Sequence, residues 1–278
     1  MMILVTGATG NVGRPLVEMV TARGAEVRAV TRDRQAAGLS CEVVEGDAAS
    51  PDSLRGVTAL FVNPRAVGTE VDRLLAAAAG SGVRRVVALS ANNVDDDFSR
   101  QPSRFRGDRN KETEDAVIAS GLQWVSVRAS TFAPNSVGMW GEQIRAGDVV
   151  RGPYANAAET PVDPRDIAAV AAVALLEDDL LGRRVEVTGP QTLTQREMVG
   201  VIGTVLGRQL EYVDIAPELA RKVILGKGFS EAFVDANLAR LAALVDSPAV
   251  VAPDAEKILG RPPASFADWV SRNEAAFR

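Results

Sequence analysis

Short apolar runs and amphipathic stretches alternate along the first half of the chain. Residues 2–6 form a short continuous apolar run, which is typical of a strand buried on both faces. Residues 11–22 follow with apolar positions at helical spacing. Because such units recur up to residue 128, the pattern predicts a parallel sheet covered by helices. Further strands are expected at 26–31, 42–45, 58–63, 85–90 and 123–128, and helices at 69–79 and 111–119, with another helix starting at Ser50-Pro51.

After residue 130 the pattern is less regular. Residues 163–166 combine an N-cap aspartate, a proline and an acid, which predicts a helix start. Residues 184–188 resemble a strand, and Thr194 with Glu197 forms a capping box for a helix that Gly207 would end. From Ala216 onward the chain is mainly helical in pattern. We therefore expect an α/β protein with a Rossmann-type, doubly wound parallel sheet and a smaller, mainly helical C-terminal substrate lobe. The expected division is 1–130 for a dinucleotide-binding core and 131–278 for a lobe partly woven onto it, with 163–188 returning to the sheet.

Composition narrows the function classes. The chain has 278 residues, 46% of them hydrophobic, and a net charge of −5, which argues against nucleic acid or an anionic membrane as a partner. It has no histidine and one cysteine, which excludes a histidine- or cysteine-rich metal site and an internal disulfide. No apolar run approaches the length of a membrane span. These features predict a soluble, cytoplasmic monomer or homodimer that acts on a small molecule.

A glycine-rich turn follows the first expected strand. In VTGATGNVG, glycines 7, 10 and 13 stand between that strand and the first helix. Glycine permits the tight turn, lets the backbone approach a pyrophosphate and lets the helix pack closely on the strand. The free N–H groups at the start of the helix then favour the phosphates. The order of strand, glycines and helix predicts a dinucleotide site.

The end of the second strand indicates which dinucleotide binds. An acid at this position suits the 2′-hydroxyl of NAD(H), whereas an arginine suits the 2′-phosphate of NADP(H). This chain has Thr31-Arg32, which favours NADP(H) over NAD(H), although Asp33 follows directly. The alternative is that Arg32 is an ordinary solvated arginine at a strand end.

Several stretches together resemble a known group of proteins. TGATGNVG looks like the signature of extended and atypical short-chain dehydrogenase/reductases, and VRAVTRD, GVRRVVALSA, KETEDAVIASGLQWVSVRASTFAPN and PVDPRDIAAVAAVAL look like the NmrA-like branch of the atypical members. The resemblance covers nearly the whole chain. That branch includes NAD(P)H-dependent quinone and azo-type reductases and also redox sensors that bind the dinucleotide without turning it over.

The resemblance also implies roles for individual residues. Asp47 would lie near the adenine, Asn63 and Pro64 would line the nicotinamide side, and Ser90 would occupy the position of the superfamily's catalytic serine. Asp47 could equally cap a turn, and Ser90 could satisfy a strand end. The residues implied to bind the cofactor are Thr6, Gly7, Thr9, Gly10, Asn11, Val12, Gly13, Arg32, Asp47, Asn63, Pro64, Ser90 and Lys111.

The chain departs from the superfamily's Tyr-x-x-x-Lys motif. Lys111 could be the lysine of that motif or only a first-turn helix residue, but Gly107 stands where the tyrosine is expected. The two tyrosines of the chain are Tyr154 and Tyr212, and the histidine that some reductases of the branch have near Asn110 is absent. Reduction of an unactivated ketone needs a proton donor. A conjugated acceptor spreads the accepted charge, so a positive field from Lys111 and a nearby arginine, or water, can suffice.

Two functions therefore remain open. One is hydride transfer from NADPH to a quinone-like or other conjugated molecule, and the other is a non-catalytic NADP(H) sensor that acts through a protein partner. An acceptor pocket is expected outside the carboxyl ends of the strands. Phe132, Asn135, Trp140 and Tyr154 would line it, or the aromatic residues would be ordinary core packing. The basic run 100–111 is either a solvated loop or a flap over the cofactor or an anionic acceptor.

Overall fold

The central element of the fold is a parallel sheet. The computed structural model describes residues 1–31, 33–35 and 37–278, and within them seven strands pair in the order β3-β2-β1-β4-β5-β6-β9. Every neighbouring pair is parallel, and the strand order reverses between β1 and β4, which confirms the predicted doubly wound sheet. The strands are β1 (Met2–Thr6), β2 (Glu26–Thr31), β3 (Glu42–Glu45), β4 (Val57–Val62), β5 (Arg85–Ala91), β6 (Gln123–Ala129) and β9 (Arg183–Val187).

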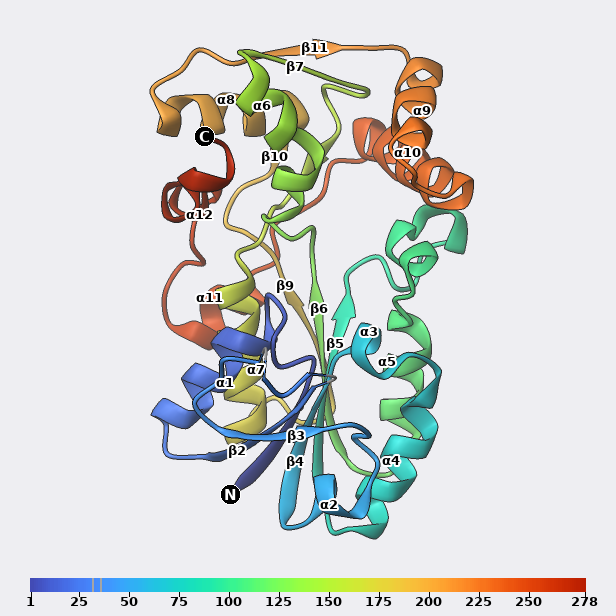
Figure 1. Ribbon diagram of the computed structural model, residues 1–278, viewed down its shortest axis with the longest axis vertical. Coiled ribbons are helices and arrows are strands. Elements are labelled where there is room, and N and C mark those ends of the chain that lie inside the picture. The colour runs from blue at the N-terminus through green and yellow to red at the C-terminus, as the bar shows by residue number, and fades with distance from the viewer. Residues whose placement is uncertain (32, 36) are drawn as a thin grey trace.

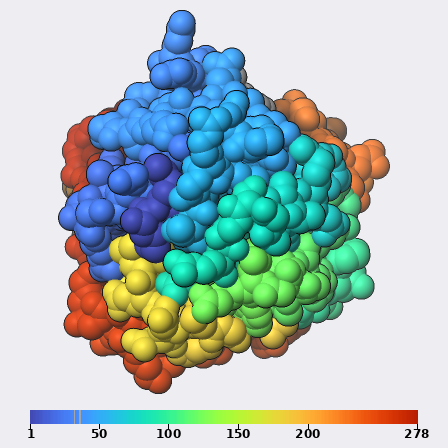
Figure 2. Space-filling model, turned by 90° about the horizontal axis from the view of Figure 1, so that it is seen from below, coloured from blue at the N-terminus to red at the C-terminus, as the bar shows by residue number. Residues whose placement is uncertain are grey.

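Helices cover both faces of this sheet (Figure 1). One face carries α1 (Gly13–Ala22), α7 (Pro164–Leu176) and α11 (Asp254–Leu259), and the other carries α4 (Val71–Gly80) and α5 (Asn110–Ala119). The short helices α2 (Pro51–Leu54) and α3 (Pro64–Val67) follow β3 and β4. Seen from the amino ends of the strands, the surface is formed by the first half of the chain and the α7–β9 turn, with the C-terminal helices only at the rim (Figure 2).

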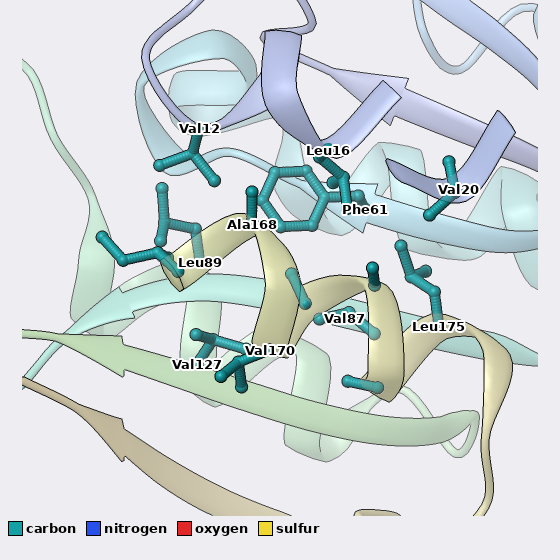
Figure 3. Close-up of a cluster of buried hydrophobic side chains, with 14 of the residues drawn as sticks. Val12, Leu16, Val20, Phe61, Val87, Leu89, Val127, Ala168, Val170 and Leu175 are labelled. Carbon is teal, nitrogen blue, oxygen red and sulfur yellow. The ribbon is translucent and has the colours of Figure 1, made fainter. Parts of the chain in front are cut away.

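The core between the sheet and the α1–α7 layer is built around Phe61. This β4 side chain is fully buried and lies between Leu16 of α1, Ala168 of α7 and Val87 of β5 (Figure 3). The α7 sequence, PRDIAAVAAVALL, is almost entirely apolar after its first turn, which explains why nearly the whole helix is buried. Asp163 caps it by accepting a hydrogen bond from the Arg165 N–H (2.8 Å), as the sequence predicted.

A second, mainly helical region lies beyond the carboxyl ends of the strands (Figure 1). Its own core packs Trp140 edge-on against Tyr212, with ring centroids 6.3 Å apart, together with Phe266 and Trp269. The predicted capping box at Thr194 is confirmed, and its helix ends at Gly207. The elements are α6 (Glu142–Ala146), β7 (Val149–Gly152), β8 (Ala158–Glu159), β10 (Leu193–Thr194), α8 (Gln195–Leu206), β11 (Glu211–Asp214), α9 (Pro217–Gly226), α10 (Glu231–Asp246) and α12 (Phe266–Arg272), with single turns at 68–70, 98–100, 102–106 and 274–276 and a π-helical turn at 137–141.

A buried carboxylate joins this lobe to the sheet. Glu159 of β8 is 1% exposed and pairs with Arg240 of α10. It also accepts hydrogen bonds from Thr131, just beyond β6 (2.7 Å), and from Gln195 of α8 (2.9 Å). Burial alone would raise the pKa of Glu159, but the facing guanidinium and these donors lower it, so the carboxylate is ionised. Among the described residues, none of the helices is both long and apolar enough to cross a membrane.

Replacing Phe61 with alanine should open a cavity at the contact of β4 with α1 and α7. The expected loss is about 3–5 kcal/mol of unfolding free energy, measured by denaturant titration, whereas Phe61→Leu should cost less than half as much. Equal, small losses for both variants would show that this contact is not a rigidly packed core.

Candidate functional site

The turn between β1 and α1 has a geometry that only glycine allows at two positions. Gly7 has a φ of +65°, and a Cβ there would lie 2.8 Å from the Asn63 side-chain nitrogen. A Cβ on Gly13 would lie 2.2 Å from the Gly7 carbonyl oxygen, so α1 starts directly against the turn. Thr9, Gly10 and Asn11 form the exposed tip, while Val12 anchors the turn in the core. The backbone therefore presents the start of α1 openly, as phosphate binding requires.

Thr6 fixes the neighbouring strand end to this turn. Its hydroxyl donates to the Phe61 carbonyl oxygen (3.0 Å) and accepts from the Asn63 N–H (2.8 Å). The Asn63 side chain in turn caps α3 by accepting from the Arg65 N–H (3.1 Å), and Pro64 occupies the first helical position. The structure thus brings the predicted residues Thr6, Gly7, Asn63 and Pro64 together at the point where the strand order reverses.

The ends of β2 and β3 carry the other predicted nucleotide contacts. Arg32 lies outside the described residues. Asp47 accepts from the Ala49 N–H (2.9 Å), which closes a turn, and forms a two-pronged ion pair with Arg73 (2.8 and 2.9 Å). Chiefly because of the Arg73 hydrogen bonds, the pKa of Asp47 is below its usual range. Asp47 therefore has a structural role at the surface, and its contact with an adenine stays a prediction.

Ser90 lies near the end of β5, beneath α5 and beside a buried carboxylate. Its hydroxyl is buried and, within the part of the chain that the structure describes, has no hydrogen-bond partner of normal geometry. The neighbouring Glu114 of α5 is fully buried and binds Arg128 (2.5 Å), Ser126 (2.5 Å) and Arg184 (3.1 Å). Burial raises the pKa of Glu114, but the Arg128 and Ser126 hydrogen bonds outweigh it and lower the pKa to about 2.

Lys111 is held by two acids, Asp115 on α5 and Asp95 in the segment after β5. Its ammonium lies 2.9 Å from Asp115 and 3.4 Å from Asp95, and the Asp115 hydrogen bond is the main reason why the pKa of Lys111 is raised. Its charge is therefore largely compensated, and its predicted catalytic role remains a hypothesis. Gly107, where the motif tyrosine would stand, has a φ of +97° and precedes the helix, which begins at Asn110. Position 107 therefore lacks both the tyrosine side chain and the helical backbone that a Tyr-x-x-x-Lys motif would have.

The basic segment 100–111, called the strap below, is folded, although Arg100, Phe105, Arg106 and Gly107 are exposed. Residues 102–106 form a 3-10 turn in which Arg104 pairs with Glu112 (2.6 Å) and lies over the Phe98 ring (4.0 Å). Asp108 accepts two hydrogen bonds from Arg65 of α3 (2.8 and 3.4 Å), so the strap is tied to the end of β4. This pair could not be predicted from the sequence, because residues 43 positions apart show no local pattern.

The predicted acceptor-pocket residues are distributed over three places. Phe132 and Asn135 follow β6, with Phe132 half-buried against the core and Asn135 exposed. Trp140 is 3% exposed in the lobe core, which is the packing role that the sequence left open. Tyr154, which alone among the described non-glycine residues has a positive φ (+55°), lines a separate lobe pocket with Asn156, Asp214 and Pro217.

Comparison with known proteins gives consistent matches over the full chain. The model of the NmrA-like family matches residues 1–249. A (4-alkanoyl-5-oxo-2,5-dihydrofuran-3-yl)methyl phosphate reductase of Streptomyces griseus is 38% identical, and an NAD(P)H azoreductase of Xenophilus azovorans is 31% identical, each over 99% of both chains. The NADPH-dependent quinone oxidoreductase of Escherichia coli, complexed with NADPH, has the same fold, with a TM-score of 0.82 at 18% identity over 99% of this chain and 100% of that chain.

Gly13→Ala should abolish dinucleotide binding, because its Cβ has no room against the Gly7 carbonyl oxygen. We expect NADPH affinity, measured by fluorescence titration, to fall by at least about a hundredfold, that is by about 3 kcal/mol or more. Gly200→Ala, inside α8 with nothing within 4 Å of its added Cβ, is the matched control and should leave affinity unchanged. Normal affinity in Gly13→Ala would contradict a phosphate role for this turn.

Glu114 should make the protein acid-labile. Its folded-state pKa of about 2 lies below the unfolded value, so its contribution is complete above about pH 4.5 and is lost as the pH falls toward 2. This contribution of Glu114 to the unfolding free energy is about 3 kcal/mol. In Glu114→Gln the unfolding free energy at pH 7 should fall by a similar amount, and its slope between pH 4.5 and 2.5 should flatten. An unchanged slope would show that other carboxylates dominate acid unfolding.

Proposed function

Since this chain belongs to the NmrA-like family, we propose that it transfers a hydride from NADPH to a quinone-like or other conjugated small molecule without a catalytic tyrosine. It is an NAD(P)H-dependent reductase, as its full-length relatives are. The NADPH preference and the acceptor class are our inference. One observation carries the acceptor class: Gly107, in a left-handed turn, stands where a proton-donating tyrosine would be needed.

The chain's two tyrosines do not replace that donor. Tyr212 is buried in the lobe core, where its hydroxyl donates to the Pro153 carbonyl oxygen (2.9 Å) and desolvation raises its pKa above the normal range. Tyr154 packs against the α9–α10 pair. There is no histidine. Without a strong acid in the site, an acceptor that delocalises the incoming charge is the one that can react readily.

The residues at the reversal of strand order fit a dinucleotide. The free N–H groups at the start of α1 would hold the pyrophosphate, and Gly7 leaves room for the Asn63 side chain beside it. Asn63 and Pro64 would face the nicotinamide, and Arg32 would pair with the 2′-phosphate. When bound, the cofactor supplies the hydride. The protein's part is to orient it at the carboxyl ends of β4 and β5 and to exclude water with the lobe above them (Figure 1).

The names of the relatives support a conjugated acceptor. The substrate named for the Streptomyces griseus enzyme is a (4-alkanoyl-5-oxo-2,5-dihydrofuran-3-yl)methyl phosphate, in which the ring double bond is conjugated to carbonyl groups. The Xenophilus azovorans enzyme is named for azo compounds. In each case, added charge spreads over a conjugated system, which matches a site that has no tyrosine donor.

Purified protein should oxidise NADPH with conjugated acceptors and not with simple ketones. We expect turnover with naphthoquinones or unsaturated lactones, followed by the loss of cofactor absorbance, and at least about a hundredfold lower rate with an unactivated ketone such as cyclohexanone. Tight NADPH binding without oxidation by any acceptor would instead support a sensor role. Efficient ketone reduction would contradict the proposed acceptor class.

Arg32→Ala should remove the preference for NADPH. Losing a charge-assisted hydrogen bond to the 2′-phosphate should weaken NADPH binding by about ten- to a hundredfold and leave NADH binding within about twofold. The measurement is the pair of dissociation constants for the two cofactors. A parallel loss for both would mean that Arg32 supports the fold and does not read the phosphate.

A further inference from the structure

The loop between β2 and β3 carries the part of the proposed site that distinguishes the two dinucleotides. It follows Arg32, the residue expected to pair with the 2′-phosphate, and it ends where β3 begins at Glu42. Its described residues, 33–35 and 37–41, form neither a helix nor a strand, and most of their side chains are exposed. The position of such a loop depends on a few specific contacts.

The first part of this β2–β3 loop is held by the two strands that it joins. The Thr31 hydroxyl accepts from the Asp33 N–H (3.3 Å), and the Glu45 carboxylate accepts from the Arg34 N–H (3.2 Å). The Gly46 N–H donates to the Thr31 carbonyl oxygen (3.1 Å), which joins the ends of β2 and β3. These bonds fix the start of the loop to the carboxyl edge of the sheet.

The second part of the loop is held by Arg14 of α1. Arg14 Nη1 donates to the Gly38 carbonyl oxygen and Nη2 donates to the Ala37 carbonyl oxygen, both at 3.0 Å. Because a guanidinium is a rigid fork of donors, it matches two carbonyl groups that are adjacent in the chain. These partners lie 24 and 23 positions away in the sequence, so the helix, and not a local turn, sets the position of this part of the loop.

The backbone of Arg14 belongs to the glycine turn. Arg14 follows Gly13 directly, and its N–H donates to the Gly10 carbonyl oxygen (3.1 Å). The close fit of Gly13 against the Gly7 carbonyl oxygen leaves α1 no room to move relative to this turn. One residue therefore connects the backbone proposed to hold the pyrophosphate with the loop that follows the proposed 2′-phosphate contact.

The helix itself does not explain an arginine at this position. A cation in the first turn of a helix is unfavourable with respect to the helix dipole, and the first turn of α1 has no acid to compensate it. The buried face of α1 is formed by other residues, such as Leu16 and Val20, whereas Arg14 is half-buried. The contact with the loop accounts for this arginine better than helix stability or core packing does.

We propose that Arg14 is a positioning residue for the cofactor and that it keeps the β2–β3 loop ready to bind the 2′-phosphate of NADP(H). This rests on the proposed function, because it concerns the same cofactor. Arg14 acts through the loop and does not contact the 2′-phosphate. Without this anchor, the loop has to be ordered when NADPH binds, and the cost of ordering weakens binding. NADH has no 2′-phosphate and gains little from an ordered loop.

Cofactor affinities in Arg14 variants test the proposal without any turnover. By fluorescence titration, Arg14→Met should weaken NADPH binding about tenfold, leave NADH binding within about twofold, and be partly rescued in Arg14→Lys. Arg196→Met is the matched control, because Arg196 is likewise the second residue of its helix and donates to a distant carbonyl oxygen, that of Tyr212 (3.0 Å). Equal losses for both cofactors, or no loss for either, would overturn the proposal.

A double-mutant cycle shows whether Arg14 acts through the proposed 2′-phosphate contact. In an Arg32→Ala background, Arg14→Met should change NADPH affinity by less than about twofold, because no phosphate contact is left to position. Losses that simply multiply would show that the two residues act independently, which contradicts a positioning role for Arg14.

The single cysteine of the chain reports on the loop in the absence of cofactor. Cys41 lies at the end of the loop, half-buried against the core. At a fixed pH, iodoacetamide should alkylate it about fivefold faster or more in Arg14→Met than in the wild type or Arg196→Met, because a released loop opens more often. Equal rates would show that Arg14 does not anchor the loop.

These measurements also separate the proposal from the proposed function. If alkylation and NADPH affinity change as expected but no conjugated acceptor is reduced, the role of Arg14 stands and the proposed acceptor class fails. If conjugated acceptors are reduced but Arg14→Met binds NADPH as tightly as the wild type, the acceptor class stands and the role of Arg14 is wrong.

Discussion

The Thr6 hydroxyl joins the end of β1 to the end of β4, and the rest of the site depends on this junction. It donates to the end of β4 at Phe61 and accepts from Asn63, the first residue beyond that strand. These two bonds fix the carboxyl ends of β1 and β4 to each other. The helices that follow these strands, α1 and α4, lie on opposite faces of the sheet. Because the glycine turn packs on Asn63 and Asn63 caps α3, a shift of either strand would move every group of the proposed cofactor site.

Local patterns predicted the sheet and the glycine turn well. Strand ends at Thr6, Thr31 and Glu45 agree with the sequence expectation because apolar runs bounded by glycine or charge mark buried strands clearly. The small lobe strands β7, β8, β10 and β11 were missed. They have two to four residues and pair with distant segments, such as Glu211 with Val149, so no periodicity can develop in them.

The site was predictable only where it depends on local backbone. The Gly7–Gly13 turn follows from the spacing of the glycines. Whether a charged side chain forms an ion pair, in contrast, depends on residues distant in the sequence. Lys111 looked available in the sequence and is held by Asp95 and Asp115. Arg104 looked solvated and pairs with Glu112. Ion pairs between residues far apart in sequence leave no pattern that a single chain can reveal.

Two buried carboxylates, Glu114 and Glu159, bind side chains at the end of β6 and just beyond it. Each is kept ionised by an arginine and by hydroxyl or amide donors, and each links an element of the lobe or outer layer to the end of β6. Breaking such a pair leaves an unpaired buried charge, which costs far more than the net gain from forming it. These pairs therefore fix the position of this strand end, Glu114 through Ser126 and Arg128 of β6 and Glu159 through Thr131 just beyond it.

The loss of the motif tyrosine is a change of backbone as well as of side chain. Tyr-x-x-x-Lys requires one helical turn between the two residues, but here α5 starts at Asn110 and Gly107 adopts a left-handed conformation that tyrosine rarely takes. Restoring a tyrosine at position 107 would thus strain the strap without placing a hydroxyl on the helix. The left-handed turn instead directs the chain so that Arg109 precedes α5 and Asp108 meets Arg65. The segment exchanges a proton donor for positive charge, which agrees with the proposed acceptor, a conjugated molecule that can hold the incoming electrons without immediate protonation.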